Sequence, residues 1–145
     1  MEINNRKAKY DYNILEEIEC GIELVGTEVK SIRNGSVNLK DSYAIIKNGE
    51  AYLLNTHISL YEESNIFNHE ETRTRKLLLH KKEILKLNDK IRIEGYTLIP
   101  LKMYFVKNKV KVLLGICKGK KLYDKRETIK KRDMERELRQ KMKGE

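Results

Sequence analysis

Two pairs of apolar runs, each separated by a short turn, give the clearest local predictions. Asn48 and Gly49 separate SYAII from AYLLN, and an Asn-Gly pair readily takes the two positive φ angles of a type I′ turn. We therefore expect these runs to pair as an antiparallel hairpin. A second hairpin is predicted where TLIPLKMYFV and VKVLLGIC flank the turn-like residues 107–109. Pro100 interrupts the first of these runs and predicts an edge strand or a bulge.

The segment NILEEIECGIEL fits two periodicities. Ile14, Ile18 and Ile22 fall on one helical face, whereas Ile18, Cys20, Ile22 and Leu24 alternate as they would along a half-buried strand. We favour the strand.

Two helices are predicted between the strands. Thr27 can cap a short helix over EVKSIR, which Asn34 and Gly35 would end. A longer helix is expected over KKEILKLNDKIRI, whose core-facing apolar residues recur at three- and four-residue spacing: Ile84, Leu87 and Ile91.

A long loop, from about His57 to Arg75, separates the first hairpin from the longer helix and contains TRTRK. Loops of this length inside a small domain are usually functional or mobile. Taken together, these elements predict a mainly β protein with antiparallel strands, helices and no βαβ alternation. A small closed or partly closed barrel is the simplest architecture for such a protein. Such barrels commonly bind oligonucleotides or oligosaccharides, although a fold alone proves no function.

Composition adds a basic tail to this picture. The chain has 145 residues, 39% of them apolar, with no Trp and two Phe, which suits one domain with a modest core. Its net charge is +9, and residues 118–145 hold 12 Lys or Arg against 6 Asp or Glu. The body is therefore mildly basic and the tail strongly basic. This balance indicates a polyanionic partner, either nucleic acid or an anionic membrane surface.

The remaining composition argues against metals and membranes. Cys20 and Cys117 lie far apart behind a polar start without a signal peptide, so we expect free buried thiols in a reducing cytoplasm. No apolar run approaches the roughly 20 residues of a membrane span. The histidines have no neighbours at zinc-ligand spacing, and we expect neither a metal nor a cofactor.

Seven stretches occur in one order and at one spacing: NRKAKYDY, GIELVGTEVKSIRNG, LKDSYA, NGEAYLLNTHI, TRTRKLLLH, EGYTLIPLKMYF and KGKKLYDKRE. Together they closely resemble the SsrA-binding protein family, also called small protein B, the bacterial partners of transfer-messenger RNA. The resemblance covers essentially the whole chain up to about Asp133. GTEVKSIR together with KGKKLYDKR carries most of its specificity.

The resemblance implies an oligonucleotide-binding (OB) type β-barrel with two to three accessory helices. It divides the chain into an RNA-binding body, residues 1–119, and a basic tail, residues 120–145, disordered alone and helical on the ribosome. In that family the body grips the tRNA-like half of transfer-messenger RNA and carries it to ribosomes stalled on messages without a stop codon, where incomplete peptides are tagged. The implied protein is a cytoplasmic, monomeric adaptor without enzymatic activity.

Basic residues in three parts of the body can supply phosphate contacts: Arg6, Lys7 and Lys9 on an N-terminal arm, Lys30 and Arg33 on the short helix, and Arg73, Arg75 and Lys76 in the loop. Scattered surface charge is the alternative interpretation. Glu28 is different, because a carboxylate in a basic surface repels phosphate unless it accepts hydrogen bonds from a base edge. By resemblance we assign it to RNA recognition.

Asn55 and His57 lie two apart at the end of a strand and so on one face. An unpaired base could stack on His57 and hydrogen-bond to Asn55, although a structural pair is the alternative. We complete the predicted RNA surface with Asn5, Ser31 and Lys118.

The predicted ribosome-binding segment of the tail is Lys120, Lys121, Tyr123, Asp124, Lys125 and Arg126. Acid-before-base pairs at i,i+4 contribute only about 0.3 to 0.5 kcal/mol each to an isolated helix. This hardly offsets helix nucleation, so we expect the free tail to be disordered.

A nuclease is the competing class. It would use the same basic surface, with Glu70, Glu71 or Asp124 holding a divalent ion. These carboxylates are scattered rather than clustered. An adaptor should shift structured RNA in a gel and leave it intact in the presence of magnesium.

Overall fold

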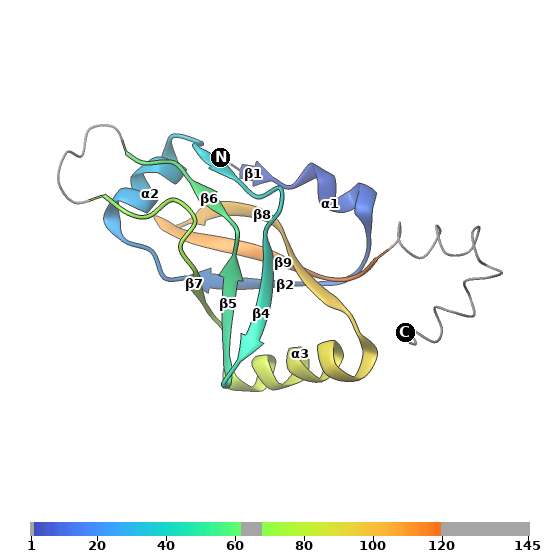
Figure 1. The fold of residues 1–145 in the computed structure, drawn as a ribbon. Coiled ribbons are helices and arrows are strands. Elements are labelled where there is room, and N and C mark those ends of the chain that lie inside the picture. The colour runs from blue at the N-terminus through green and yellow to red at the C-terminus, as the bar shows by residue number, and fades with distance from the viewer. Residues whose placement is uncertain (1, 62–67, 120–145) are drawn as a thin grey trace.

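Antiparallel strands are the main regular elements of the computed structural model, which describes residues 2–61 and 68–119 (Figure 1). Within these ranges the strands are β1 (Glu2–Asn4), β2 (Tyr12–Ile22), β3 (Val37–Asn38), β4 (Tyr43–Lys47), β5 (Glu50–Leu54), β6 (His57–Ile58), β7 (Arg75–Leu78), β8 (Thr97–Val106) and β9 (Lys109–Gly119). The helices are α1 (Arg6–Asp11), α2 (Gly26–Arg33) and α3 (Lys81–Glu94).

The main sheet has the strand order β1-β8-β4-β5-β7-β2-β9, and β8 also pairs with β9. Leu98 of β8 is opposite Ala44 of β4 on one edge and Ile116 of β9 on the other. The pairings from β8 through β4, β5, β7, β2 and β9 therefore return to β8. A separate two-stranded sheet joins β3 and β6. The prediction of a mainly β antiparallel protein with few helices is confirmed.

Both predicted hairpins are present. Asn48 and Gly49 take φ angles of 52° and 78° between β4 and β5, as a type I′ turn requires. Lys107 and Asn108 take φ angles of 49° and 67° between β8 and β9, so this turn also comprises two left-handed residues. The β8–β9 register shifts just after Pro100, which confirms the predicted bulge.

The ambiguous segment forms strand β2, as we favoured. It pairs with β9 from Tyr12 opposite Gly119 to Gly21 opposite Lys111. Cys20 is a buried free thiol in this strand, and burial raises its pKa to about 12. A thiol with such a pKa is inert as a nucleophile.

The predicted cap of α2 is wrong. The N-cap position is Val25 rather than Thr27, and the helix begins at Gly26. The reason is that Glu28 reaches back to its own helix terminus, where its Oε1 accepts the Val25 N–H at 2.9 Å. The predicted end of the helix is confirmed by Gly35, whose φ of 77° no helix can continue.

The longer predicted helix is confirmed as α3. Ile84 and Leu87 are buried, and Ile91 packs partly buried against the main core. Gly95 follows the helix in the left-handed conformation, with φ 72°. No helix in residues 2–61 and 68–119 is long and apolar enough to cross a membrane.

The N-terminal arm contains a helix, α1, that we did not predict. Its buried Ala8 packs in a small apolar cluster with Ile99 and Leu101, while Leu98 and Met103 of the same strand lie in the main core. Both faces of β8 are therefore covered. A six-residue helix presents too little periodic pattern to be recognised from sequence alone.

Candidate nucleic-acid interface

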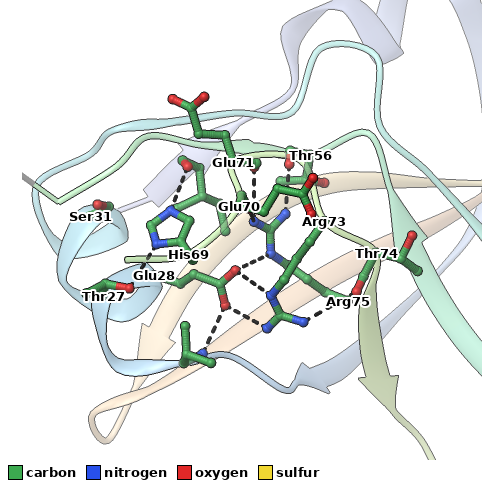
Figure 2. A network of polar contacts seen from close by, with 12 residues as sticks. Thr27, Glu28, Ser31, Thr56, His69, Glu70, Glu71, Arg73, Thr74 and Arg75 are labelled. Atoms are coloured by element: carbon green, nitrogen blue, oxygen red, sulfur yellow. Dashed lines mark hydrogen bonds and ion pairs between the residues drawn. The ribbon is translucent and has the colours of Figure 1, made fainter. Parts of the chain in front are cut away.

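A buried carboxylate, Glu28 of α2, faces Arg75, the first residue of β7, and Arg73, which lies two residues before that strand (Figure 2). Arg73 donates from Nε to Oε2 at 2.9 Å and from Nη2 to Oε1 at 2.8 Å, which makes a two-bond ion pair. Arg75 donates from Nε to Oε2 at 2.8 Å. The side chains of Glu28 and Arg75 are 0% exposed, whereas that of Arg73 is 32% exposed. We call these three residues the Glu28 cluster.

Arg75 ties the Glu28 cluster to the surrounding backbone. Its Nη1 donates to the Thr56 carbonyl at 2.8 Å. Its Nη2 donates to the carbonyls of Glu71 at 3.0 Å and Glu70 at 3.3 Å. The guanidinium thus joins α2, the residue before β6 and the segment that precedes β7. Its burial follows from strand geometry, because Arg75 lies two residues before the core residue Leu77 and shares its face.

Glu28 is held in its ionised form. Burial alone would raise the pKa of this carboxyl, but hydrogen bonds from Arg73, the Val25 N–H and Arg75 outweigh burial and lower it. Two guanidinium groups face one carboxylate, so the cluster carries a net positive charge. That charge faces solvent through Arg73, because Arg73 is its partly exposed member.

A histidine also anchors the segment that precedes β7 (Figure 2). The buried His69 lies with Nε2 2.8 Å from the Ile58 carbonyl and Nδ1 2.9 Å from Thr27 Oγ1. Because a carbonyl only accepts, Nε2 carries a proton and donates it to the Ile58 carbonyl, and Nδ1 shares a hydrogen bond with the Thr27 hydroxyl. Thr27 thus joins the helix to the loop rather than capping the helix.

Four of the predicted contact residues are buried in this structure: Glu28, Arg75, Ser31 and Asn5. Glu28 cannot offer its carboxylate to a base edge, since it is fully buried and both oxygens already accept hydrogen bonds. Arg75 is equally buried and cannot reach a phosphate. Ser31 is 2% exposed and donates to the Ser59 carbonyl at 2.7 Å. Sequence reasoning placed these polar side chains outside because their partners are distant in the chain.

The exposed side of α2 carries the other two predicted cations. Lys30 and Arg33 are both exposed. The Lys30 ammonium lies 5.4 Å from the centroid of the Tyr61 ring, and the Arg33 guanidinium carbon lies 4.7 Å from the centroid of the Phe105 ring. Cations at these distances are attracted by the ring quadrupole. The two rings come from segments that sequence reasoning did not connect with α2.

Asn5 is buried and organises the backbone before α1. Its Nδ2 donates to the carbonyls of Leu39 at 3.1 Å and Pro100 at 2.9 Å. Its Oδ1 is a buried side-chain atom without a hydrogen-bond partner. The residue also lines a surface pocket of about 220 Å³, together with Lys7, Asp11, Tyr12, Lys40, Asp41 and Tyr43.

The N-terminal cations lie on α1. Arg6 and Lys7 are exposed, and the Lys7 ammonium is 3.9 Å from Asp11 and 3.8 Å from Asp41. Lys118 is exposed near the end of β9, opposite the second residue of β2, and β2 directly follows α1. This pairing places Lys118 near the point where α1 leads into β2, and Figure 1 shows the end of β9 on that side of the molecule.

Asn55 and His57 do not share a strand face as we predicted. Asn55 takes a φ of 60° in the gap between β5 and β6, which breaks the alternation on which the prediction rested. His57 begins β6, and its Nε2 lies 3.5 Å from Glu71 Oε2. Lys76 of β7 is 3.4 Å from Glu50.

The described residues contain no group of three His, Cys, Asp or Glu that could hold a metal ion. Glu70 and Glu71, which the nuclease alternative would use, offer their carbonyls to Arg75. The third carboxylate of that alternative, Asp124, lies outside the described residues. So do all the predicted ribosome-binding residues: Lys120, Lys121, Tyr123, Asp124, Lys125 and Arg126.

The comparisons with known proteins agree on one family. The sequence model of the SmpB protein matches residues 2–144. A curated relative from Ligilactobacillus salivarius (strain UCC118), named SsrA-binding protein, is 58% identical over 140 residues, which are 97% of this chain and 90% of the relative. The SsrA-binding protein of Staphylococcus aureus (strain Newman) is also 58% identical, over 97% of this chain and 91% of its own length.

A solved structure supports the same assignment at the level of the fold. A chain in the structure described as "tmRNA-SmpB: a journey to the center of the bacterial ribosome" superposes with a TM-score of 0.70 at 48% sequence identity. The match covers 82% of this chain and 84% of the solved one. With a family match over nearly all its length and curated relatives at 58% identity, this chain belongs to the SmpB family.

Proposed function

We propose that this chain is an RNA-binding adaptor that binds the tRNA-like part of transfer-messenger RNA and delivers it to stalled ribosomes for trans-translation. Membership of the SmpB family over residues 2–144 carries this proposal. The relatives at 58% identity bear the name SsrA-binding protein, and the similar solved chain comes from a tmRNA-SmpB structure. The protein acts by binding and has no catalytic step of its own.

The body is an OB-type barrel in this proposal. The return of the strand pairings to β8 supports closure, because a ring of paired strands leaves no open edge between its first and last member. The helices α1, α2 and α3 are the accessory helices. We assign residues 1–119 to this body and residues 120–145 to a basic tail that enters the message channel of the ribosome. The adaptor works in the cytoplasm as a monomer.

The proposed RNA surface consists of the predicted residues that are exposed or half-buried. The cations are Arg6, Lys7, Lys30, Arg33, Arg73, Lys76 and Lys118, of which Arg73 and Lys76 are half-buried. The polar residues are Asn55, which is exposed, and His57, which is half-buried. Two of the buried predicted residues hold part of this surface in position. Glu28 fixes the guanidinium of Arg73, and Arg75 fixes the backbone that carries it.

The affinity for RNA should depend steeply on salt. Six of these cations, all except Arg33, would each neutralise about one phosphate, which gives a slope of log affinity against log salt of about −4 to −5. The tail makes the slope of the full chain steeper. Fluorescence anisotropy with the labelled tRNA-like half of transfer-messenger RNA, between about 50 and 200 mM salt, measures this slope.

Two variants calibrate the measurement. Lys76→Gln should make the slope shallower by about 0.7 to 0.9. Lys82→Gln removes an exposed cation from α3, outside the proposed RNA surface, and should leave the slope unchanged. A slope near zero, or equal affinity for an unstructured RNA of the same length, would contradict the proposed function.

A further inference from the structure

The guanidinium of Arg33 has one side covered and one side open. Its central carbon lies 4.7 Å from the centroid of the Phe105 ring. The ring itself is held in place, because Phe105 belongs to β8 and packs partly buried against the main core. Arg33 is exposed at the last position of α2. The side of the guanidinium that faces away from the ring is therefore accessible.

The described residues give Arg33 no ion pair that would explain its position. Among the salt bridges of the described ranges, Glu28 takes Arg73 and Arg75, and α2 supplies no acidic neighbour to Arg33. Among the residues that the structure describes, its partner is the Phe105 ring. A guanidinium is planar, weakly hydrated and suited to stacking. It thus forms a flat, positively charged surface backed by an aromatic ring.

A second cation lies one turn earlier on the same side of the helix. Residues three apart in a helix are neighbours on its surface, which places Lys30 beside Arg33. The Lys30 ammonium is 5.4 Å from the Tyr61 ring and remains exposed. An ammonium is a compact point charge that suits a phosphate, whereas a guanidinium plane also suits the face of a base.

We propose that this side of α2 holds a single unpaired nucleotide of the bound RNA, with its base stacked on the free side of Arg33 and a neighbouring phosphate on Lys30. Unpaired bases in folded RNA commonly stack on aromatic rings or on arginine planes. The proposal rests on the proposed function and deepens it, because it changes Arg33 from one phosphate contact among several into a base contact. We call Arg33 and Phe105 the Arg33 platform.

Arg33→Lys separates the two roles, because it keeps the charge and removes the plane. If the base stacks, this variant should bind the tRNA-like half of transfer-messenger RNA roughly 5- to 100-fold more weakly than the wild type, with an unchanged salt slope. Phe105→Leu removes the ring and should weaken binding in the same way. The fold-loss of affinity in the double variant should be smaller than the product of the two single fold-losses, since both changes affect one contact.

The matched control is Arg92→Lys. Arg92 is exposed on α3, where its Nη2 lies 3.9 Å from Asp89, and its replacement should not change RNA affinity. Urea unfolding of each variant separates a folding defect from a binding defect. Arg33→Lys, which changes an exposed side chain, should unfold within about 0.5 kcal/mol of the wild type.

A set of RNAs with single abasic nucleotides at unpaired positions identifies the stacked base. One such RNA should bind the wild type weakly, by a similar 5- to 100-fold, and should lose little further affinity with Arg33→Lys. The coupling between one nucleotide and one side chain is a readout that general loss of charge does not produce.

Any of the following results would overturn the proposal that a base stacks on Arg33. If Arg33→Lys binds like the wild type while Arg33→Gln binds weakly with a shallower salt slope, Arg33 is a phosphate contact. If all Arg33 and Phe105 variants bind RNA normally but tagging falls, this side of α2 contacts a protein partner. If no abasic position couples to Arg33, no base stacks there. If the wild type itself fails to bind the tRNA-like RNA, the failure belongs to the proposed function.

Discussion

Replacing Glu28 with glutamine should lower the free energy of unfolding by about 3 to 5 kcal/mol, the usual result of removing one partner from a buried ion pair. The amide keeps the shape of the side chain but leaves the guanidinium of Arg75 buried without its counter-charge. It also weakens the bond that holds the N-terminus of α2, where Glu28 accepts the Val25 N–H. Urea unfolding followed by far-ultraviolet circular dichroism measures the change.

The control for this prediction is Glu23→Gln. Glu23 is exposed in the segment just before α2, so its replacement removes the same charge from nearly the same place. Its effect should lie within about 0.5 kcal/mol. Equal stability of the Glu28 and Glu23 variants would show that the Glu28 cluster does not hold the fold together.

The effect of Glu28→Gln should depend on pH. The pKa of Glu28 is lowered in the folded protein, whereas an unfolded glutamate titrates near pH 4.3, roughly its ordinary value. A lowered native pKa means that the stabilisation is complete above the unfolded pKa and is lost as pH falls through the native one. The difference between wild type and variant should therefore be largest near neutral pH and shrink below about pH 4. A difference that grows on acidification would contradict an ionised Glu28.

Ending the chain after Gly119 should abolish tagging of incomplete peptides and leave RNA binding nearly intact. β9 ends at Gly119 and all other strands and helices of the described residues precede it. The exposed cations assigned to the RNA surface also precede it. The removed part carries most of the +6 charge of residues 118–145, so binding should be compared near physiological salt, where charges more than about 8 Å apart are screened.

The measurement is a reconstituted translation reaction stalled on a message without a stop codon. Full-length protein should support tagging, and the shortened protein should not. A full-length variant with the order of residues 120–145 scrambled keeps the charge of the tail and serves as the control. Tagging by the scrambled variant would show that charge alone suffices. Tagging by the shortened protein would remove the tail from the mechanism.

Short-range patterns predicted much of the fold. The turn at Asn48 and Gly49 and the apolar spacing of α3 depend only on neighbouring residues, and both appear as expected. The strands β3 and β6 were not predicted, because each contains two residues and shows no period. The cap of α2 was misplaced, since its true contact comes from the side chain of Glu28 rather than from the hydroxyl of Thr27.

The candidate site was less predictable, because its partners are distant in the chain. Glu28 lies 45 residues from Arg73 and 47 from Arg75, and no local pattern joins them. One signal was available. Arg75 and Leu77 are two apart on a strand, so an inward Leu77 places Arg75 inward as well. The ring partners of Lys30 and Arg33 left no trace in the sequence at all, since any of the eight Tyr and two Phe could have filled those positions.

The pairing of β2 with β9 also sets when this protein can fold during its own synthesis. Residues 12–21 pair with residues 111–119, and β1 pairs with residues 102–104. At about 5 to 20 residues per second, β2 spends roughly 5 to 20 s without its longest neighbour. During that time Ile14, Ile18 and Ile22 form an apolar strand with a free edge, which is prone to pair with other chains. A protein proposed to act in translation therefore cannot complete its own main sheet until β9, its last described strand, has been synthesised.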